Sequence, residues 1–348
     1  MKIDTILGQQ HKRKIKFDPE LHKYTDEYGK TYTSVTQLIG TIEPQFDTEF
    51  WSMYRAIDQT GIYKPRPDPV NRQITVWYNS TWQTFSIDLL YSGILPVVKT
   101  PGRIVGEWKE TTEEACAWGT VKHNYLEECI NRFTKTGGTT FNYVADDKGY
   151  TFKVASLEEF DRSPLVITYP AIASLLRKLI QDGYVLYAEL RVYDPEALIA
   201  GTIDLIAIKQ GKFVIVDWKT NRKPLKFEAG YYKKQWDETR TIKYETDIWV
   251  SNEARLLYPL MDVPYCKGSI YTLQLSLYAY ICERWGLTFE YAKLCHIRPK
   301  VGKRKEILYD EVGNRIEEEP EIYSITYNKG AIERLVHFHK QNNQHEQN

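Results

Sequence analysis

Two aspartates in the second half of the chain could hold a metal ion beside the amine of a lysine. Asp217 lies 13 positions after Asp204, and Lys219 lies two positions further on. Carboxylate oxygens suit Mg²⁺, which commonly takes one or two of them from a protein. If these residues belong to strands, the alternation of side chains places Lys219 on the same face as Asp217. The residues therefore predict metal-assisted chemistry, provided that the fold brings the two carboxylates together.

A hairpin would bring them together. Residues 200–208 and 213–219 are rich in Ile, Val and Phe and are divided by Gln210-Gly211, which predicts two antiparallel strands with a two-residue turn. With this turn Asp204 faces Asp217, and directly opposed side chains lie roughly 4.5–5.5 Å apart at Cβ. Two carboxylates about 5 Å apart repel by roughly 3 kcal/mol at an effective dielectric near 20. A divalent cation between them would offset that cost.

Further residues that could serve such a site occur in order along the chain. They are Gly119, His123 and Glu127 in a helical stretch, Glu189 in the stretch YAELRVYD, and Gln274 and Tyr278 in the stretch QLSLY. The first three recur at every fourth position and so share one helix face, where Gly119 would allow a close approach to a sheet. Together with Asp204 and Asp217-Trp218-Lys219, this ordered set resembles the PD-(D/E)XK nuclease superfamily, in the variant of RecB-like and phage-type exonucleases. The resemblance covers residues 119–278.

Two details refine the resemblance. Ile203 precedes Asp204 where the family name has Pro, but Gly201-Thr202-Ile203-Asp204 fits the Gly-x-x-Asp form of RecB-like members. The N-terminal stretch KFDPELHKYTDEYGKTYTSVTQLI resembles the opening segment of phage-encoded relatives and of mitochondrial genome maintenance exonucleases.

The resemblance implies which residues do the chemistry. Lys219 would position or help deprotonate the attacking water and stabilise negative charge near the scissile phosphate. Glu189 would orient this lysine or support a second ion. One or two Mg²⁺ ions, for which Mn²⁺ would substitute, would neutralise the transition state and help the leaving oxyanion. The principal ion would be held by His123, Asp204, Asp217 and the backbone carbonyl of Trp218.

The resemblance also implies contacts with DNA. Gln274 would form a hydrogen bond to the DNA backbone or the terminal nucleotide, and Tyr278 would stack on it. Arg222 and Lys223 belong to a run of basic residues that flanks the proposed metal site. Simpler interpretations stay open: a basic run often forms only a solvated helix or loop face, and Gln274 and Tyr278 could be polar residues on the outside of an amphipathic helix. Glu127 and Gly119 would support the site.

The overall composition neither indicates nor excludes a nucleic-acid partner. The 348-residue chain has 46 Lys plus Arg and 46 Asp plus Glu, so any electrostatic footprint for DNA must be local. No apolar run approaches the roughly 20 residues that cross a bilayer, and no signal-peptide apolar region follows the N-terminus. We therefore expect a cytoplasmic protein, in the host cytoplasm if a virus encodes it, with no membrane partner. Five cysteines without a CxxC pair predict free thiols rather than an iron–sulfur cluster.

The elements that must position the site predict an α/β fold. A helix is expected from Thr111 to about Phe133, a second over 168–182 and a third over 271–285. Strands are expected in VLYAELRVYD, in the hairpin and in YAKLCHIRP. This order places helix, three strands, helix and strand in the restriction-endonuclease-like core that the resemblance implies, a mixed sheet flanked by helices (α-β-β-β-α-β) with N-terminal and internal insertions.

The expected domain organisation follows from composition shifts. Residues 1–110 would form a hairpin and a helix, with a proline-rich β flap inserted at 57–105 whose hairpin turns at Asn79-Ser80. Its aromatic residues favour packing over stacking on bases. Residues 111–340 would form the nuclease core, with an aromatic-rich insertion at 226–270. Residues 341–348 have nothing apolar to bury and are expected to be disordered.

Three functions fit these observations. The first is a Mg²⁺-dependent DNA exonuclease that hydrolyses phosphodiester bonds during end processing, recombination or replication, acting on DNA ends or single strands. A separate helicase, recombinase or single-strand-binding protein could work with it. The second is a structure-specific or flap endonuclease of the same superfamily. The third is a non-catalytic DNA-binding module on the same fold, against which the intact Asp204, Asp217 and Lys219 argue.

Overall fold

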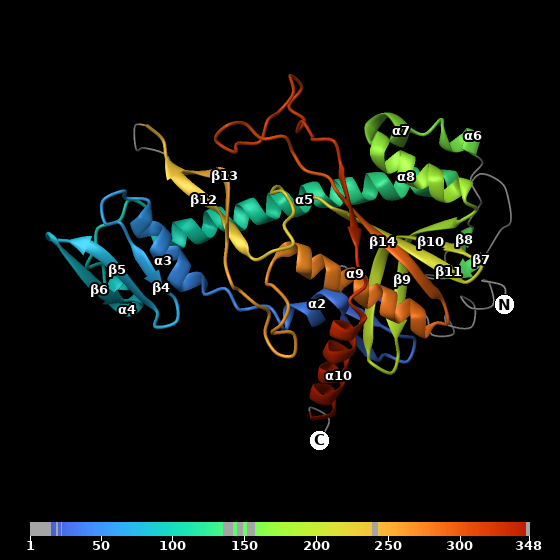
Figure 1. Cartoon of the computed structure of the whole chain (residues 1–348), viewed down its shortest axis with the longest axis horizontal. Coiled ribbons are helices and arrows are strands. Elements are labelled where there is room, and N and C mark those ends of the chain that lie inside the picture. The colour runs from blue at the N-terminus through green and yellow to red at the C-terminus, as the bar shows by residue number, and fades with distance from the viewer. Residues whose placement is uncertain are drawn as a thin grey trace.

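A mixed β-sheet covered by helices forms one part of the molecule, on the right in Figure 1. The structure, a computed structural model of the chain, describes residues 15–345 except 19, 22, 135–141, 145–148, 152–156 and 239–242. The strand order in the sheet is β1-β2-β3-β10-β11-β14-β15, with β9 also paired to β10. The strands are β1 (Lys16–Asp18), β2 (Lys23–Thr25), β3 (Thr31–Ser34), β9 (Val185–Asp194), β10 (Ile199–Lys209), β11 (Lys212–Lys219), β14 (Thr288–His296) and β15 (Glu321–Ile325).

The expected hairpin is confirmed by β10 and β11. They pair antiparallel from Leu205 opposite Val216 to Lys209 opposite Lys212, and the turn is Gln210-Gly211. Both turn residues have positive φ, +49° and +81°, as a two-residue hairpin turn of this kind requires. The ladder ends at Leu205 and Val216, so Asp204 and Asp217 are the next residues along the two strands and lie just beyond the paired part of the hairpin.

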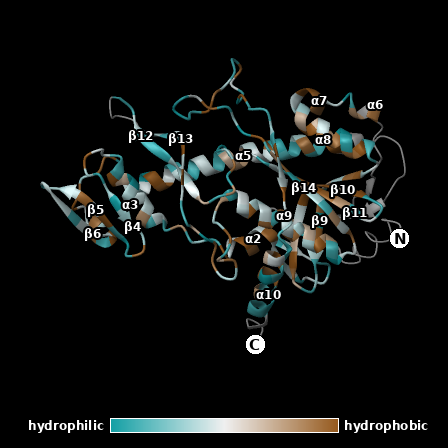
Figure 2. Ribbon diagram, in the orientation of Figure 1, coloured by the Kyte–Doolittle hydropathy of each residue, from teal (hydrophilic) through white to brown (hydrophobic). Residues whose placement is uncertain are grey.

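Helices cover both faces of the sheet. Residues of β10 alternate between two cores: Ile206 and Ile208 pack on the side of α9 (Lys267–Arg284), and Leu205 and Ala207 pack on the other side. The second core includes α5 (Pro101–Thr134) and α8 (Pro170–Gln181). Figure 2 shows hydrophobic residues concentrated on these central strands. The further helices are α2 (Val35–Gly40), α6 (Leu157–Phe160), α7 (Pro164–Thr168) and α10 (Lys329–His345).

The core order matches the expected one. Helix α5 precedes β9, β10 and β11, and α9 then connects β11 to β14, which pair in parallel. A parallel pair needs such a crossover connection. Helices α6 to α8 lie between α5 and β9, and short strands β7 (Asn142–Val144) and β8 (Gly149–Thr151) pair separately. The mixed α/β architecture is therefore confirmed.

The expected β flap is instead part of a small module with its own core. Helix α3 (Thr48–Asp58) packs with β4 (Arg66–Asp68), β5 (Gln73–Tyr78), β6 (Thr81–Ser86) and α4 (Ile87–Tyr91) around buried residues such as Phe50, Ile74 and Val76. The hairpin turns at Asn79-Ser80, as expected. The module begins with α3 rather than at residue 57, because the apolar face of α3 completes this core.

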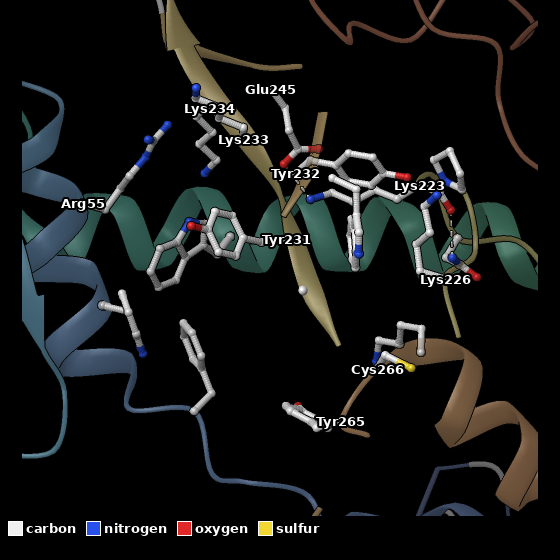
Figure 3. A pocket seen from close by; sticks show the side chains of 18 of the residues that line it. Arg55, Lys223, Lys226, Tyr231, Tyr232, Lys233, Lys234, Glu245, Tyr265 and Cys266 are labelled. Atoms are coloured by element: carbon white, nitrogen blue, oxygen red, sulfur yellow. Dashed lines mark hydrogen bonds and ion pairs between the residues drawn. The ribbon is translucent and has the colours of Figure 1, made fainter. Parts of the chain in front are cut away.

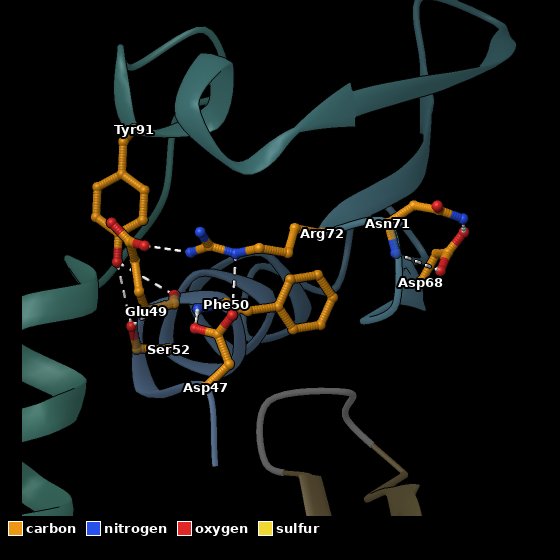
Figure 4. Close-up of polar contacts among 8 residues, drawn as sticks. All are labelled: Asp47, Glu49, Phe50, Ser52, Asp68, Asn71, Arg72 and Tyr91. Atoms are coloured by element: carbon orange, nitrogen blue, oxygen red, sulfur yellow. Dashed lines mark hydrogen bonds and ion pairs between the residues drawn. The ribbon is translucent and has the colours of Figure 1, made fainter. Parts of the chain in front are cut away.

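Polar contacts fasten α3 to the sheet of this module (Figure 4). Asp47 caps the helix by accepting from the Phe50 N–H at 2.9 Å. Arg72, between β4 and β5, forms ion pairs with Asp47, at 3.0 Å, and with Glu49. Such contacts between exposed groups stabilise little individually, but they fix which way α3 lies.

Helix α5 starts earlier than expected. It begins at Pro101 rather than near Thr111, so the boundary expected between residues 110 and 111 falls inside one continuous helix. Pro101 lies within the range expected for the flap (57–105), yet proline is well tolerated at the first helical position, where its missing N–H costs nothing. Thr100 Oγ1 accepts from the Arg103 N–H at 3.3 Å and caps this start. Helix α5 therefore links the N-terminal module to the core (Figure 1).

Two further differences concern the insertion and the tail. The insertion at 226–270 contains a second hairpin, β12 (Gly230–Trp236) and β13 (Lys243–Ser251), which its mixed polar sequence did not reveal. Helix α10 continues to His345, so residues 341–345 are helical rather than disordered, since no glycine or proline interrupts them; residues 346–348 lie outside the described part. None of the described helices combines the length and apolar character needed to cross a bilayer.

Candidate functional site

Asp204 is held at the open end of the β10–β11 hairpin. Its Oδ2 accepts a hydrogen bond of 2.8 Å from the Trp218 backbone N–H. The carbonyl of a strand residue points to the same neighbouring strand as its N–H, so the Trp218 carbonyl faces β10 as well. The Trp218 side chain is 1% exposed and packs in the core, which fixes this end of the strand.

Three side chains converge here with metal-ligand chemistry. His123, Glu189 and Asp204 each offer one donor atom, and these atoms all lie within 4.8 Å of one another. His123 Nδ1 is 3.6 Å from Asp204 Oδ1. The three residues come from α5, β9 and β10, and α5 is far from the two strands in sequence. His123 and Glu189 therefore lie near Asp204, and the roles expected for them stay predictions.

Glu189 occupies a strained position. Its φ is +51°, in the left-handed region that residues other than glycine rarely adopt. The pairing of β9 with β10 passes from Leu190 opposite Ile203 to Ala188 opposite Leu205 and omits the pair between them, Glu189 and Asp204. Strain of this kind persists where the surroundings hold it and is frequent at functional sites.

Electrostatic crowding accompanies this strain. Burial, and then the nearby Asp204, Glu127 and Asp217 carboxylates, raise the pKa of Glu189 to about 8. A carboxyl group that is crowded by other carboxylates retains its proton until the pH rises, because its charged form is repelled. A cation among these groups would remove that repulsion.

Asp217 and Lys219 form a buried ion pair beside this group. Lys219 Nζ is 2.7 Å from Asp217 Oδ2, and the Asp217 side chain is 1% exposed. Burial outweighs the attraction of Lys219 and, with the help of Asp204, raises the pKa of Asp217 to about 6. Burial opposes the charge of Lys219, but the Asp217 and Asp204 carboxylates outweigh it and raise the pKa of the ammonium group. The expected pairing of an amine with the two aspartates is present, although Asp217 is turned toward Lys219 rather than grouped with the three donors above.

The close approach of α5 depends on Gly119. A Cβ atom at this position would lie 2.9 Å from Thr220 Oγ1, immediately after β11. Without that Cβ, the helix reaches the strand end and His123, one turn later, reaches Asp204. Glu127, one further turn on, is near enough to raise the pKa of Glu189. Gly119 and Glu127 therefore lie close to the site, and the supporting roles expected for them stay predictions.

The Gln274 and Tyr278 pair differs from expectation. Tyr278 is 4% exposed, and its ring fills the space that Gly201 leaves open, since a Cβ there would lie 2.7 Å from Tyr278 Cε1. Gln274 Nε2 donates to the Tyr278 hydroxyl at 3.3 Å. Because α9 packs on the sheet at this position, stacking of Tyr278 on a nucleotide is not available. The Tyr278 ring instead packs against Gly201 of β10, three residues before Asp204, and the DNA contact expected of Gln274 stays a prediction.

The basic run around the hairpin is divided by the fold. Arg222 and Lys223 are exposed and follow the site end of β11, whereas Lys209 and Lys212 lie at the opposite end, beside the turn. Lys223 Nζ forms an ion pair of 2.7 Å with Glu245 in β13. Only the part of the run after Lys219 is therefore near the site.

A cleft that the sequence did not reveal opens next to Asn221 and Lys223 (Figure 3). Its volume is about 950 Å³, and we call it the aromatic–lysine cleft. The run GYYKKQW in β12 was the available signal, because it alternates aromatic and basic residues, but it did not show which partners would face it. Aromatic and basic members are Phe46, Trp51, Tyr54, Arg55, Trp108, Lys223, Lys226, Tyr231, Tyr232, Lys233, Lys234, Lys243, Trp249, Tyr265 and Lys267.

No protein-family model matches this chain, and no curated protein matches it closely enough to indicate a relationship. What the chain does must be argued from its own residues.

Proposed function

We propose that this chain is a divalent-metal-dependent deoxyribonuclease of the PD-(D/E)XK type, acting as an exonuclease. The convergence of His123, Glu189 and Asp204, next to the Asp217–Lys219 ion pair, carries the proposal. An imidazole, several carboxylates and an ammonium group at the end of adjacent strands form a set that phosphodiester hydrolysis can use. The ordered sequence motifs support the same conclusion.

The donor set fits a hard divalent cation. Carboxylates and one imidazole suit Mg²⁺ or Mn²⁺, and the raised pKa of Glu189 reflects carboxylate repulsion that such an ion would relieve. His123, Glu189 and Asp204 would hold the ion, and Asp217 would complete the site by turning from Lys219. When bound, the metal would activate water and stabilise charge on the phosphoryl oxygens.

Lys219 acts in this proposal as a positive charge rather than as a base. Its raised pKa keeps the amine protonated at neutral pH. Tyr271 of α9 lies beneath it, with Nζ 5.0 Å from the centre of the ring, and together with Asp217 holds the ammonium group in place. From this position the group would stabilise negative charge that develops near the scissile phosphate.

The assay that tests this proposal compares three substrates. A linear duplex, a covalently closed circle and a single strand are each incubated with Mg²⁺ or with a chelator. Metal-dependent cleavage restricted to free ends is the expected result. Cutting of the closed circle would indicate the endonuclease alternative, and binding without products the non-catalytic one; either outcome would overturn the exonuclease proposal.

A further inference from the structure

The aromatic–lysine cleft is built between the N-terminal module and the loops that follow the candidate site. Its walls come from α3, the beginning of α5, the β12–β13 hairpin and the beginning of α9 (Figure 3). Of the 23 described residues that line it, 8 are aromatic, 7 are Lys or Arg and 2 are acidic. An excess of positive charge among aromatic rings is the composition that single-stranded nucleic acid binds.

The acidic residues of the cleft do not neutralise it. Asp58 is paired with Lys243 at 2.7 Å, and Glu245 with Lys223 at 2.7 Å. The remaining lysines, including Lys234 on the β12 wall, therefore leave the cleft net positive. Enclosure by the walls, and then the Arg55 guanidinium, lower the pKa of Lys234 although its side chain is exposed to solvent. A phosphate group close to Lys234 would favour the charged form of this amine.

Some of the aromatic rings present free surface on a rigid support. Phe46 is 62% exposed and Tyr231 56% exposed. Phe46 stacks on Trp51, with ring centres 6.5 Å apart and an angle of 12°, and meets Trp108 of α5 edge-on at 5.7 Å. Stacking of a base on Phe46 would cost the Phe46 ring little mobility, because neighbouring aromatic side chains already hold this ring in place.

The cleft begins beside Lys219. Asn221, which lines it, is two residues beyond Lys219. Asn221 Oδ1 accepts from the Tyr271 hydroxyl at 3.1 Å, and the Tyr271 ring lies beneath Lys219. A chain of contacts thus joins the cleft to the candidate site.

We propose that the aromatic–lysine cleft binds single-stranded DNA and leads its backbone to Lys219. The choice of DNA as ligand rests on the proposed nuclease function. Aromatic faces can accept only bases that are unstacked from their neighbours, and a duplex keeps its bases stacked inside. The single strand is therefore the substrate form that uses both the rings and the lysines.

The test is a binding titration in the presence of a chelator, so that no cleavage occurs. Fluorescence anisotropy would compare an oligothymidylate, a duplex of the same length and an abasic strand of the same charge. Wild-type protein should bind the oligothymidylate most tightly. Phe46→Ala and Tyr231→Ala should each weaken that binding by about fivefold or more, the lower end of stacking energies, and should leave binding of the abasic strand unchanged.

Controls separate the cleft from general effects. Tyr28→Ala removes a tyrosine that is 76% exposed on the N-terminal hairpin and should not change affinity. Lys234→Ala should lower the slope of log affinity against log salt by about 0.7, whereas Lys178→Ala on α8 should not. The proposal would be overturned if Phe46→Ala and Tyr231→Ala bound the oligothymidylate as tightly as the wild-type protein does. It would also be overturned if the wild-type protein bound the duplex or the abasic strand as tightly as the oligothymidylate. Absence of cleavage by a wild-type protein that shows the expected binding would contradict only the nuclease proposal.

Discussion

The candidate site and the aromatic–lysine cleft are built in opposite ways. The site consists of buried or half-buried side chains on adjacent regular elements, and apolar strand neighbours such as Val216 and Trp218 fix its geometry. The cleft is lined by exposed and half-buried rings and by lysines, and they come from segments that are distant in sequence, such as those of Phe46 and Tyr231. Under the two proposals, the residues at the sheet would carry out hydrolysis and the cleft would bind the substrate strand, so substitutions in the two regions should affect different measurements.

The largest effect is expected from Lys219→Ala. Removal of a preorganised positive charge commonly costs about 10²–10³ in turnover, so cleavage in Mg²⁺ should fall by at least that factor. Affinity for single-stranded DNA measured in chelator should stay at the parental value, because Lys219 does not line the cleft. A Lys219→Ala protein that degrades DNA at the parental rate would contradict the role assigned to this residue.

Gly119→Val should destabilise the core and disturb the metal site together. The new side chain would overlap Thr220, and overpacking of this kind costs about 1–3 kcal/mol. The matched control is Gly106→Val in the same helix, where no heavy atom lies within 4 Å of an added Cβ. Urea denaturation and Mn²⁺ titration would show the difference; equal stability and equal Mn²⁺ affinity of the two variants would refute the close-approach argument.

The pH dependence of stability should reveal the crowded carboxylates. The folded, metal-free protein binds more protons than the unfolded chain between the ordinary carboxyl pKa range and the raised values of about 6 for Asp217 and about 8 for Glu189. The free energy of unfolding should therefore decrease as the pH rises from about 4 to 8, by up to about 1.4 kcal/mol per pH unit for each proton. Thermal unfolding in chelator measures this slope.

A variant and a ligand sharpen the same measurement. Glu189→Gln should flatten the slope in its upper part, since it removes the group with the higher pKa. Added Mg²⁺ should stabilise the wild-type protein more at pH 8 than at pH 5.5, because protons compete with the ion for the carboxylates. A slope that survives unchanged in Glu189→Gln would mean that other groups cause it.

The smallest effect is expected from the exposed lysines of the cleft. Lys233→Ala should raise KM for a single strand by a few-fold and leave kcat unchanged, because uniform binding is lost without loss of transition-state stabilisation. The effect should diminish as salt is added, since phosphate contacts depend on counterion release. A drop in kcat at unchanged KM would assign Lys233 to the chemistry instead.

The sequence predicted the sheet better than the parts around it. The register of the β10–β11 hairpin followed from the apolar strands and from Gln210-Gly211, because turn and alternation are local properties. The capping box of Ser34 and Gln37 at the start of α2 is likewise a local feature. The early start of α5 at Pro101 was missed because proline in a proline-rich stretch favours a loop interpretation as much as a helix start.

Tertiary packing decided what the sequence could not. Tyr278 was expected to face DNA, but Gly201 leaves a gap on the sheet that its ring fills, and nothing near Tyr278 in sequence shows this. Likewise, Asp217 was expected among the metal ligands, whereas its carboxylate forms an ion pair with Lys219. The cleft required segments from three parts of the chain to meet, which no local pattern specifies.

Anomalous diffraction from a Mn²⁺-soaked crystal would show whether His123, Glu189 and Asp204 form a metal site. One strong peak is expected within bonding distance of His123 Nδ1 and the Asp204 and Glu189 carboxylates, and the peak should be lost in Asp204→Asn. A saturating soak that leaves no peak at these three side chains, in crystals of protein that still cleaves DNA with Mn²⁺, would show that the metal site is not formed by them.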